Sequence, residues 1–171
     1  MTQVMGAVLL TVGCGAMGLG AVRRLDQRVR DLWELSAGLD ALRRELGCRL
    51  APLPSALRVA AEECHSCAAR FFEGCAQGAG GLHGRSFQQV WREELETCPL
   101  QLTAEDRQML EQLGSVLGRY DGESQCRAIE EEVSRLGRQI VQAREDRRRL
   151  GRVYGVLGMT AGLFLAVLLI C

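Results

Sequence analysis

Uncharged residues fill the two ends of the chain, and charged residues are interspersed with apolar ones between them. Residues 2–22 and 153–171 contain no Asp, Glu, Lys or Arg. Each stretch has about the twenty residues that a helix needs to cross a hydrocarbon core roughly 30 Å thick. We therefore predict membrane-spanning helices over 1–22 and 153–171, on either side of a helical domain over 23–152.

Arginines flank both uncharged stretches on the side of the central domain, at positions 23, 24, 28 and 30 and at positions 147, 148, 149 and 152. A cleaved secretory signal carries its positive charges ahead of the apolar stretch, so the pattern favours a retained anchor. Loops rich in arginine stay in the cytoplasm. Residues 23–152 are therefore predicted to be cytoplasmic, with both termini facing outward.

Two long helices are predicted to continue from the membrane into the central domain. Apolar residues recur every three or four positions from Leu25 to Leu46, and again from Cys126 to Tyr154. This is the spacing of one helix face. The second helix would span about fifty residues from Asp121 or Gly122. We expect the two long helices to pack antiparallel.

Shorter helices are predicted between the long ones, forming a bundle distal to the membrane. Gly47 and the segment APLPSAL end the first long helix, and a new helix is expected from Pro54 or Ser55 through the segment ECHSCAARFFEGC. Residues 77–84, QGAGGLHG, are predicted to be a glycine-rich linker. The predicted fold class is all-α.

Two further helices have N-terminal capping signals. Ser86 with Gln89 forms a capping box before a short helix, and Thr103 caps another helix, with Asp106 in its first turn. The second of these contains Gly114, which costs about 1 kcal/mol relative to alanine in a helix. We expect close packing by a neighbouring helix to compensate for it.

The charge balance and the motif content exclude several functions. The chain has 21 basic and 21 acidic residues, which gives no net positive charge for nucleic acid. It contains no lysine for a phosphate-binding loop or a Schiff base, and no G-x-S-x-G motif. We therefore predict no enzymatic activity, no cofactor and no nucleic-acid partner.

The cysteines of ECHSCAARFFEGC are the candidate chemical site. At 100° per residue, Cys64, Cys67 and Cys75 fall on the same apolar stripe as Leu57 and Phe71. Cys75 lies eight residues beyond Cys67, about 12 Å along the axis, which is too far for one tetrahedral zinc site. We predict buried, inert thiols and no metal. The alternative is a membrane-tethered thiol or metal sensor that uses these three cysteines.

Glycines in the second uncharged stretch and just before it follow the spacing of one helix face. They are Gly151, Gly155, Gly158 and Gly162, and they include the G-x-x-x-G pattern twice. Small residues aligned in this way let helices approach closely within a bilayer. We predict packing between the membrane helices, or between copies in a homo-oligomer.

Several segments together resemble the stage III sporulation protein AB family. They are RRL after the first anchor, APLPSAL at 51–57, RFFE at 70–73, VWREEL at 90–95 and LTAEDRQMLEQLGSVLGRYDGESQC at 102–126. The residues that carry the resemblance are Pro52, Leu53, Ala56, Leu57, Phe71, Phe72, Trp91, Leu113, Gly114, Leu117, Gly118, Asp121 and Gln125. The cysteine density at 59–75 departs from the family's pattern.

The resemblance implies a non-catalytic platform in the mother-cell membrane during sporulation. The cytoplasmic domain of the family is similar to the inner-membrane platform protein of type II secretion systems. By that resemblance the chain would be part of a transenvelope, secretion-like complex between mother cell and forespore. Its implied partners are membrane lipid, a secretion-type ATPase and other channel components.

Overall fold

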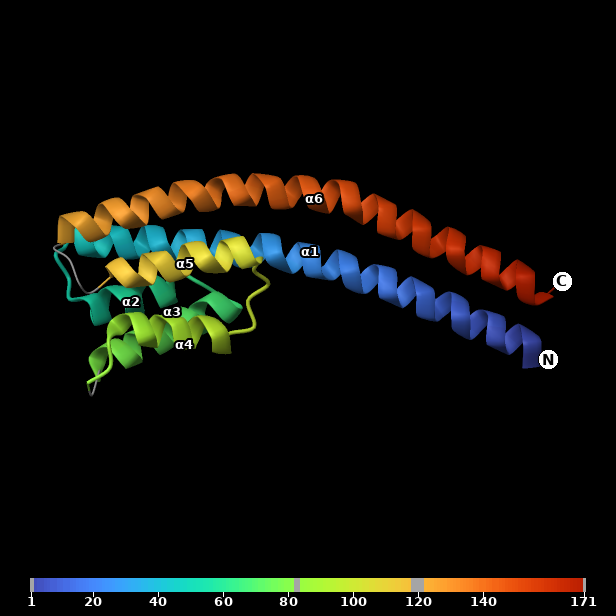
Figure 1. Ribbon diagram of the computed structural model, residues 1–171, viewed down its shortest axis with the longest axis horizontal. Helices are drawn as coiled ribbons and strands as arrows, with labels where there is room; N and C mark the ends of the chain where they lie inside the picture. Colours follow the sequence, from blue (N-terminus) through green and yellow to red (C-terminus); the bar gives the residue numbers. More distant parts are fainter. Residues whose placement is uncertain (1, 82–83, 118–121, 171) are drawn as a thin grey trace. The chain divides into compact units, whose positions relative to one another are not determined.

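The computed structural model describes residues 2–81, 84–117 and 122–170, and for many residues near the two ends it describes only the backbone. The described residues form helices and no strand, which confirms the predicted all-α class (Figure 1). The helices are α1 (Thr2–Cys48), α2 (Leu53–Glu62), α3 (Ser66–Gly80), α4 (Phe87–Thr97), α5 (Ala104–Val116) and α6 (Gly122–Ile170).

The chain forms two compact units, one of Met1–Val29 with Gln142–Cys171 and one of Arg30–Val141. Within the first unit, α1 and α6 are joined by the ion pairs Arg28–Asp146 (3.9 Å) and Asp26–Arg147. The earlier residue on α1, Asp26, pairs with the later residue on α6, Arg147, so the two helices run in opposite directions. The predicted antiparallel pairing is confirmed there. No helix among the residues searched is both long and apolar enough to span a bilayer. The predicted spans over 1–22 and 153–171 lie mostly outside the residues whose side chains are described.

In the second unit, α2 to α5 gather beside the C-terminal part of α1 (Figure 1). The predicted leucine stripe of α1 is buried there, at Leu32, Leu35, Leu39, Leu42 and Leu46. On α6, Ile129, Leu136 and Ile140 are buried as predicted. Cys126 and Val133 of the predicted stripe are only half-buried, and the neighbouring Gln125 and Glu132 are buried instead. Apolar periodicity therefore predicts the buried leucines of α1, but on α6 it misses the polar side chains of the buried face.

The prediction of one continuous helix through ECHSCAARFFEGC is wrong. Helix α2 ends at Glu62, His65 has extended backbone, and Ser66 adopts a positive φ of 54° as α3 begins. Beyond this break, Phe71 and Cys75 are buried as predicted, but Cys67 is not. Glu34 of α1 stabilises the break, because its carboxylate accepts hydrogen bonds from the backbone N–H of His65 and the hydroxyl of Ser66, both at 3.2 Å.

The prediction of a linker over 77–84 is also wrong for its first residues, because α3 continues to Gly80. Two glycines one turn apart let α4 approach α3. A Cβ atom added to Gly78 would overlap the side chain of Val90, and one added to Gly74 would overlap the carboxylate of Glu94. These glycines serve helix packing rather than chain flexibility.

Both predicted capping signals are confirmed. The backbone N–H of Gln89 donates to Ser86 Oγ (3.3 Å), and the Gln89 side chain accepts from the N–H of Ser86 (3.0 Å). Thr103 and Asp106 form the same reciprocal pair at 3.2 and 2.9 Å. Helix α5 begins directly after Thr103 and ends at Val116.

Replacement of Glu132 by glutamine is expected to raise the free energy of unfolding at pH 7. Glu132 is 4% exposed, its Oε1 has no hydrogen-bond partner in the described chain, and burial raises the pKa of its carboxyl. Because the folded-state pKa of Glu132 is raised, this carboxyl contributes to the stability of the fold below about pH 4.5, where it is protonated. That contribution is lost as the pH rises through the folded-state pKa. Thermal unfolding of the detergent-solubilised chain at pH 4 and pH 7 measures this.

The control for that experiment is Glu130→Gln, because Glu130 is an exposed carboxylate on the same helix. It should change the melting temperature little at either pH. A Glu132→Gln variant that is less stable than the wild type at pH 7 would contradict the prediction.

Candidate functional site

Four of the residues that carry the family resemblance, Phe71, Phe72, Trp91 and Gly114, meet at a row of aromatic rings inside the second unit. Phe71 and Phe72 of α3 lie edge to face at 5.2 Å between ring centroids, and Phe71 meets Trp91 of α4 edge to face at 4.7 Å. All three side chains are at most 1% exposed. Such pairs contribute about 0.5–1.5 kcal/mol each beyond the burial of their area. We call Phe71, Phe72 and Trp91 the aromatic row.

Gly114 of α5 lies at one end of the aromatic row. A Cβ atom there would stand 2.6 Å from Trp91 Cγ, and the indole N–H of Trp91 donates to the carbonyl of Leu110 at 2.8 Å. The indole is therefore held against the backbone of α5. This confirms the predicted close packing at Gly114.

Gly38 of α1 lies at the other end of the row, and sequence reasoning missed it. A Cβ atom there would stand 2.6 Å from Cys64 Sγ and 2.8 Å from Phe72 Cζ. The thiol of Cys64 donates to the carbonyl of Glu34, one turn earlier on α1 (3.2 Å). Gly38 sits between leucines in an ordinary amphipathic pattern, so no local signal indicates its contacts.

The other predicted residues take varied positions. Pro52 is the exposed N-cap of α2 and Leu53 is its first residue, half-buried. Four more are buried in the described fold: Ala56, Leu57, Leu113 and Leu117. Gln125 is buried on α6. Gly118 and Asp121 lie outside the described residues.

Of the glycines predicted to pack in the membrane, only Gly151 has described surroundings. A Cβ atom added there meets nothing within 4 Å. The surroundings of Gly155, Gly158 and Gly162 lie outside the described residues. Their role in packing stays a prediction.

The three cysteines of the candidate site differ in their surroundings. Burial raises the pKa of Cys64 to about 12, and burial with the nearby Glu94 carboxylate raises the pKa of Cys75 well above its usual value. Both thiols are buried, as predicted. Cys67 is not: it is half-exposed in the first turn of α3, and Arg70 Nη2 donates to its sulfur at 3.4 Å. The prediction that Cys67 is buried is therefore wrong.

No group of three or more His, Cys, Asp or Glu side chains in the described part of the chain could hold a metal ion. The metal form of the sensor alternative therefore has no support among these residues. The predicted absence of other cofactors stays a prediction.

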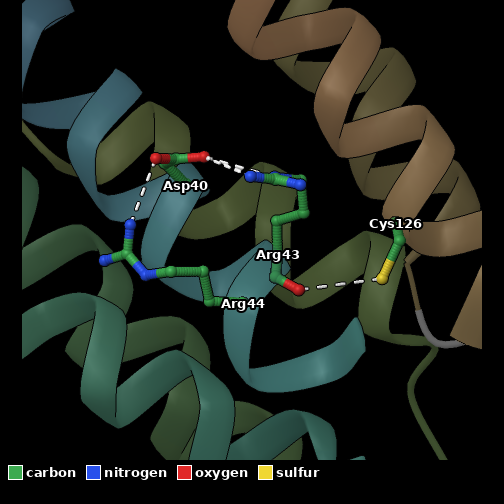
Figure 2. A network of polar contacts seen from close by, with 4 residues as sticks. All are labelled: Asp40, Arg43, Arg44 and Cys126. Atoms are coloured by element: carbon green, nitrogen blue, oxygen red, sulfur yellow. Dashed lines mark hydrogen bonds and ion pairs between the residues drawn. The ribbon is translucent and has the colours of Figure 1, made fainter. Parts of the chain in front are cut away.

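A second cysteine contact joins α6 to the end of α1 (Figure 2). The thiol of Cys126 lies 3.7 Å from the carbonyl oxygen of Arg43, and a Cβ atom on Gly47 would be 3.0 Å from the same sulfur. The guanidinium groups of Arg43 and Arg44 both donate to Asp40, at 3.2 and 3.1 Å. Asp40 thus bridges two arginines on α1, close to where α6 starts, and the three groups together keep one positive charge.

An open groove of about 560 Å³ is lined by residues of α2, α3 and α4. Its lining residues are Ala61, Glu62, Ala69, Arg70, Glu73, Gly74, Gln77 and Glu94. Arg70 and Glu73 lie in the segment RFFE and Glu94 lies in the segment VWREEL, but none of the lining residues is among those named as carrying the resemblance. The sequence gives no sign of this groove, because its carboxylates come from three separate helices.

Comparison with known proteins decides the family. The family described as stage III sporulation protein AB matches residues 3–170. The chain belongs to the stage III sporulation protein AB family. This confirms the resemblance found in the sequence, and it makes the chain a sporulation protein. The description of the family names no enzymatic activity.

A solved structure titled stage III sporulation protein AB has a similar fold, with a TM-score of 0.64 and 23% sequence identity. The match covers 71% of this chain and 96% of that one. At this identity the likeness shows the fold alone. No curated protein matches the chain.

In this member of the stage III sporulation protein AB family, Gly114→Ala is expected to lower the free energy of unfolding by about 1–3 kcal/mol, the usual cost of overpacking a core. The new methyl group would overlap the Trp91 ring, which is fixed by its hydrogen bond to Leu110. Chemical denaturation followed by circular dichroism measures the change. Gly137→Ala is the matched control, because nothing lies within 4 Å of its Cβ position, and it should be neutral or stabilising.

Iodoacetamide at pH 8 is expected to modify the exposed Cys48 rapidly and Cys64 slowly. With a pKa of about 12, only about one Cys64 in ten thousand is a thiolate at pH 8. Labelling of Cys64 in the folded chain should be roughly a hundredfold or more slower than in urea. Mass spectrometry of the cysteine-containing peptides over time measures both rates, and similar rates in the two states would contradict the burial of this thiol.

Proposed function

We propose that the chain is a non-catalytic membrane platform of a sporulation complex between mother cell and forespore, and that it binds partner proteins through its helical domain. The observation that carries this proposal is the family match over residues 3–170. The fold supports it, because α2 to α5 form a bundle around the aromatic row and leave broad helix surfaces for partners. The proposed partners are a secretion-type ATPase and other channel components.

Membrane anchorage is the second part of the proposal. It is supported by the uncharged stretches 2–22 and 153–171, whose backbone is helical over 2–22 in α1 and over 153–170 in α6. Arginines at 23–30 and 147–152 favour a cytoplasmic placement of the bundle, with both termini outward. The mother-cell membrane is the proposed location because of the family resemblance.

The thiol-sensor alternative receives less support. Cys64 and Cys75 are buried and their pKa values are raised, which disfavours the reactive thiolate. Replacement of Cys64, Cys67 and Cys75 together by alanine tests this alternative. If cells with the triple variant sporulate fully, the thiol-sensor alternative is wrong.

The platform proposal predicts that the full chain, tagged and solubilised in mild detergent from a sporulating host, co-purifies with the secretion-type ATPase. The triple cysteine variant serves as the control and should retain the ATPase. Identification of the co-purified proteins by mass spectrometry is the measurement. A chain that elutes alone, from cells in which the ATPase is present, would count against the platform role.

A further inference from the structure

Charge is distributed unevenly between the two units of the chain, although the chain as a whole is neutral. The first unit, Met1–Val29 with Gln142–Cys171, contains eight arginines and three acidic residues, which leaves an excess of five positive charges. The second unit, Arg30–Val141, contains thirteen arginines and eighteen acidic residues, which leaves an excess of five negative charges. The basic unit is also the one that contains both uncharged stretches.

Two ion pairs fix the register of α1 and α6 in the first unit. Asp26 pairs with Arg147, and Arg28 pairs with Asp146 at 3.9 Å. Two antiparallel helices advance at the same rise per residue, so each step forward on α1 corresponds to one step back on α6. Residues 23–24 of α1 are therefore level with residues 149–151 of α6.

Four arginines lie close to this level, at positions 23 and 24 on α1 and at positions 148 and 149 on α6. Along the helix axes they are spread over less than one turn, about 5 Å. All four side chains are exposed, and none of them pairs with a carboxylate in the part of the chain that the structure describes. We call Arg23, Arg24, Arg148 and Arg149 the arginine layer.

The arginine layer has the chemistry of an anion site. Like charges held at one level repel one another, and an anion bound among them removes that repulsion. A phosphate group suits the layer, because a guanidinium can donate two parallel hydrogen bonds to phosphate oxygens. The register pairs hold both helices in place, so the layer exists before the anion binds.

Exposed apolar side chains follow the arginine layer directly along α6, and they indicate which anion fits. Leu150 is 39% exposed, Val153 is 50% exposed and Val156 is 62% exposed. Cationic side chains followed by apolar ones match a phospholipid, whose phosphate lies at the membrane surface and whose acyl chains extend into the hydrocarbon core. Free phosphate or nucleic acid would leave these apolar side chains in water.

Resting on the proposed membrane anchorage, we propose that the arginine layer binds the phosphate of an anionic phospholipid, with the acyl chains along Val153 and Val156. Basic clusters next to membrane-spanning helices attract anionic lipids, and each arginine near the surface adds to the attraction. The inference names the kind of lipid and the residues that select it, which the anchorage alone does not.

The test uses the full chain, tagged, purified in mild detergent and mixed with equal amounts of phosphatidylglycerol and phosphatidylcholine. The chain is retrieved by its tag, and the lipids that it retains are quantified by mass spectrometry. Phosphatidylglycerol should be retained about tenfold or more over phosphatidylcholine, because only its net charge is negative. In 1 M NaCl the preference should largely disappear, since the Debye length falls to about 3 Å.

Glutamine in place of all four residues of the arginine layer should abolish the preference. Replacement of the α1 pair alone or of the α6 pair alone should reduce it about threefold, because both helices contribute. The matched control removes four exposed arginines of the second unit and should leave the preference unchanged: Arg58→Gln, Arg92→Gln, Arg127→Gln and Arg138→Gln. Circular dichroism shows whether the variants keep their helices, and lysine at the four layer positions should retain a preference above that of the glutamine variant.

Equal retention of the two lipids would overturn the proposal, and so would a control variant that loses as much preference as the layer variant. Displacement of phosphatidylglycerol by an equal concentration of inorganic phosphate or of a DNA fragment would also contradict it. Carbonate extraction of the membranes tests the anchorage separately. A chain that resists extraction and retains the ATPase, but has no lipid preference, would show that the lipid proposal fails while the platform function stands.

Discussion

The helical bundle depends on a row of aromatic rings packed between two glycines. Gly38 admits the ring of Phe72 on one side, and Gly114 admits the indole of Trp91 on the other. Phe71 contacts both rings edge to face, and Phe72 and Trp91 also lie edge to face at 6.4 Å between ring centroids. The row thereby connects α1, α3, α4 and α5, so a side chain at either glycine would separate two helices. The family resemblance rests partly on Phe71, Phe72, Trp91 and Gly114, and their packing gives a physical reason why these residue types occur together.

Helix α1 also organises the segments that connect the shorter helices. The carboxylate of Asp31 is 1% exposed and accepts a hydrogen bond from the backbone N–H of Gln101, between α4 and α5, at 2.8 Å. Glu34 does the same for His65, between α2 and α3. Backbone N–H groups in a loop between helices need hydrogen-bond acceptors. The carboxylates of Asp31 and Glu34, within one turn of α1, are the acceptors here. Acidic residues that the sequence places on an ordinary amphipathic helix therefore position two loops.

Sequence periodicity and capping chemistry predicted what is local in this fold. The buried leucines of α1, the length of α6 and both reciprocal caps follow from spacing and residue type alone. The break before Ser66 could not be predicted in this way, because Glu34 stabilises it from thirty-two residues away. The half-exposure of Cys67, in the first turn after this break, was missed as well. Gly38 and the groove were missed because their neighbours come from other helices.

The same close packing that stabilises the bundle also creates its most distinctive surface. Gly74 and Gly78 bring α3 and α4 together, which buries Val90 and lays the Glu94 carboxylate across the backbone of α3. A larger residue at Gly74 would push that carboxylate away, so the charge in the groove is fixed by core packing rather than by a mobile side chain.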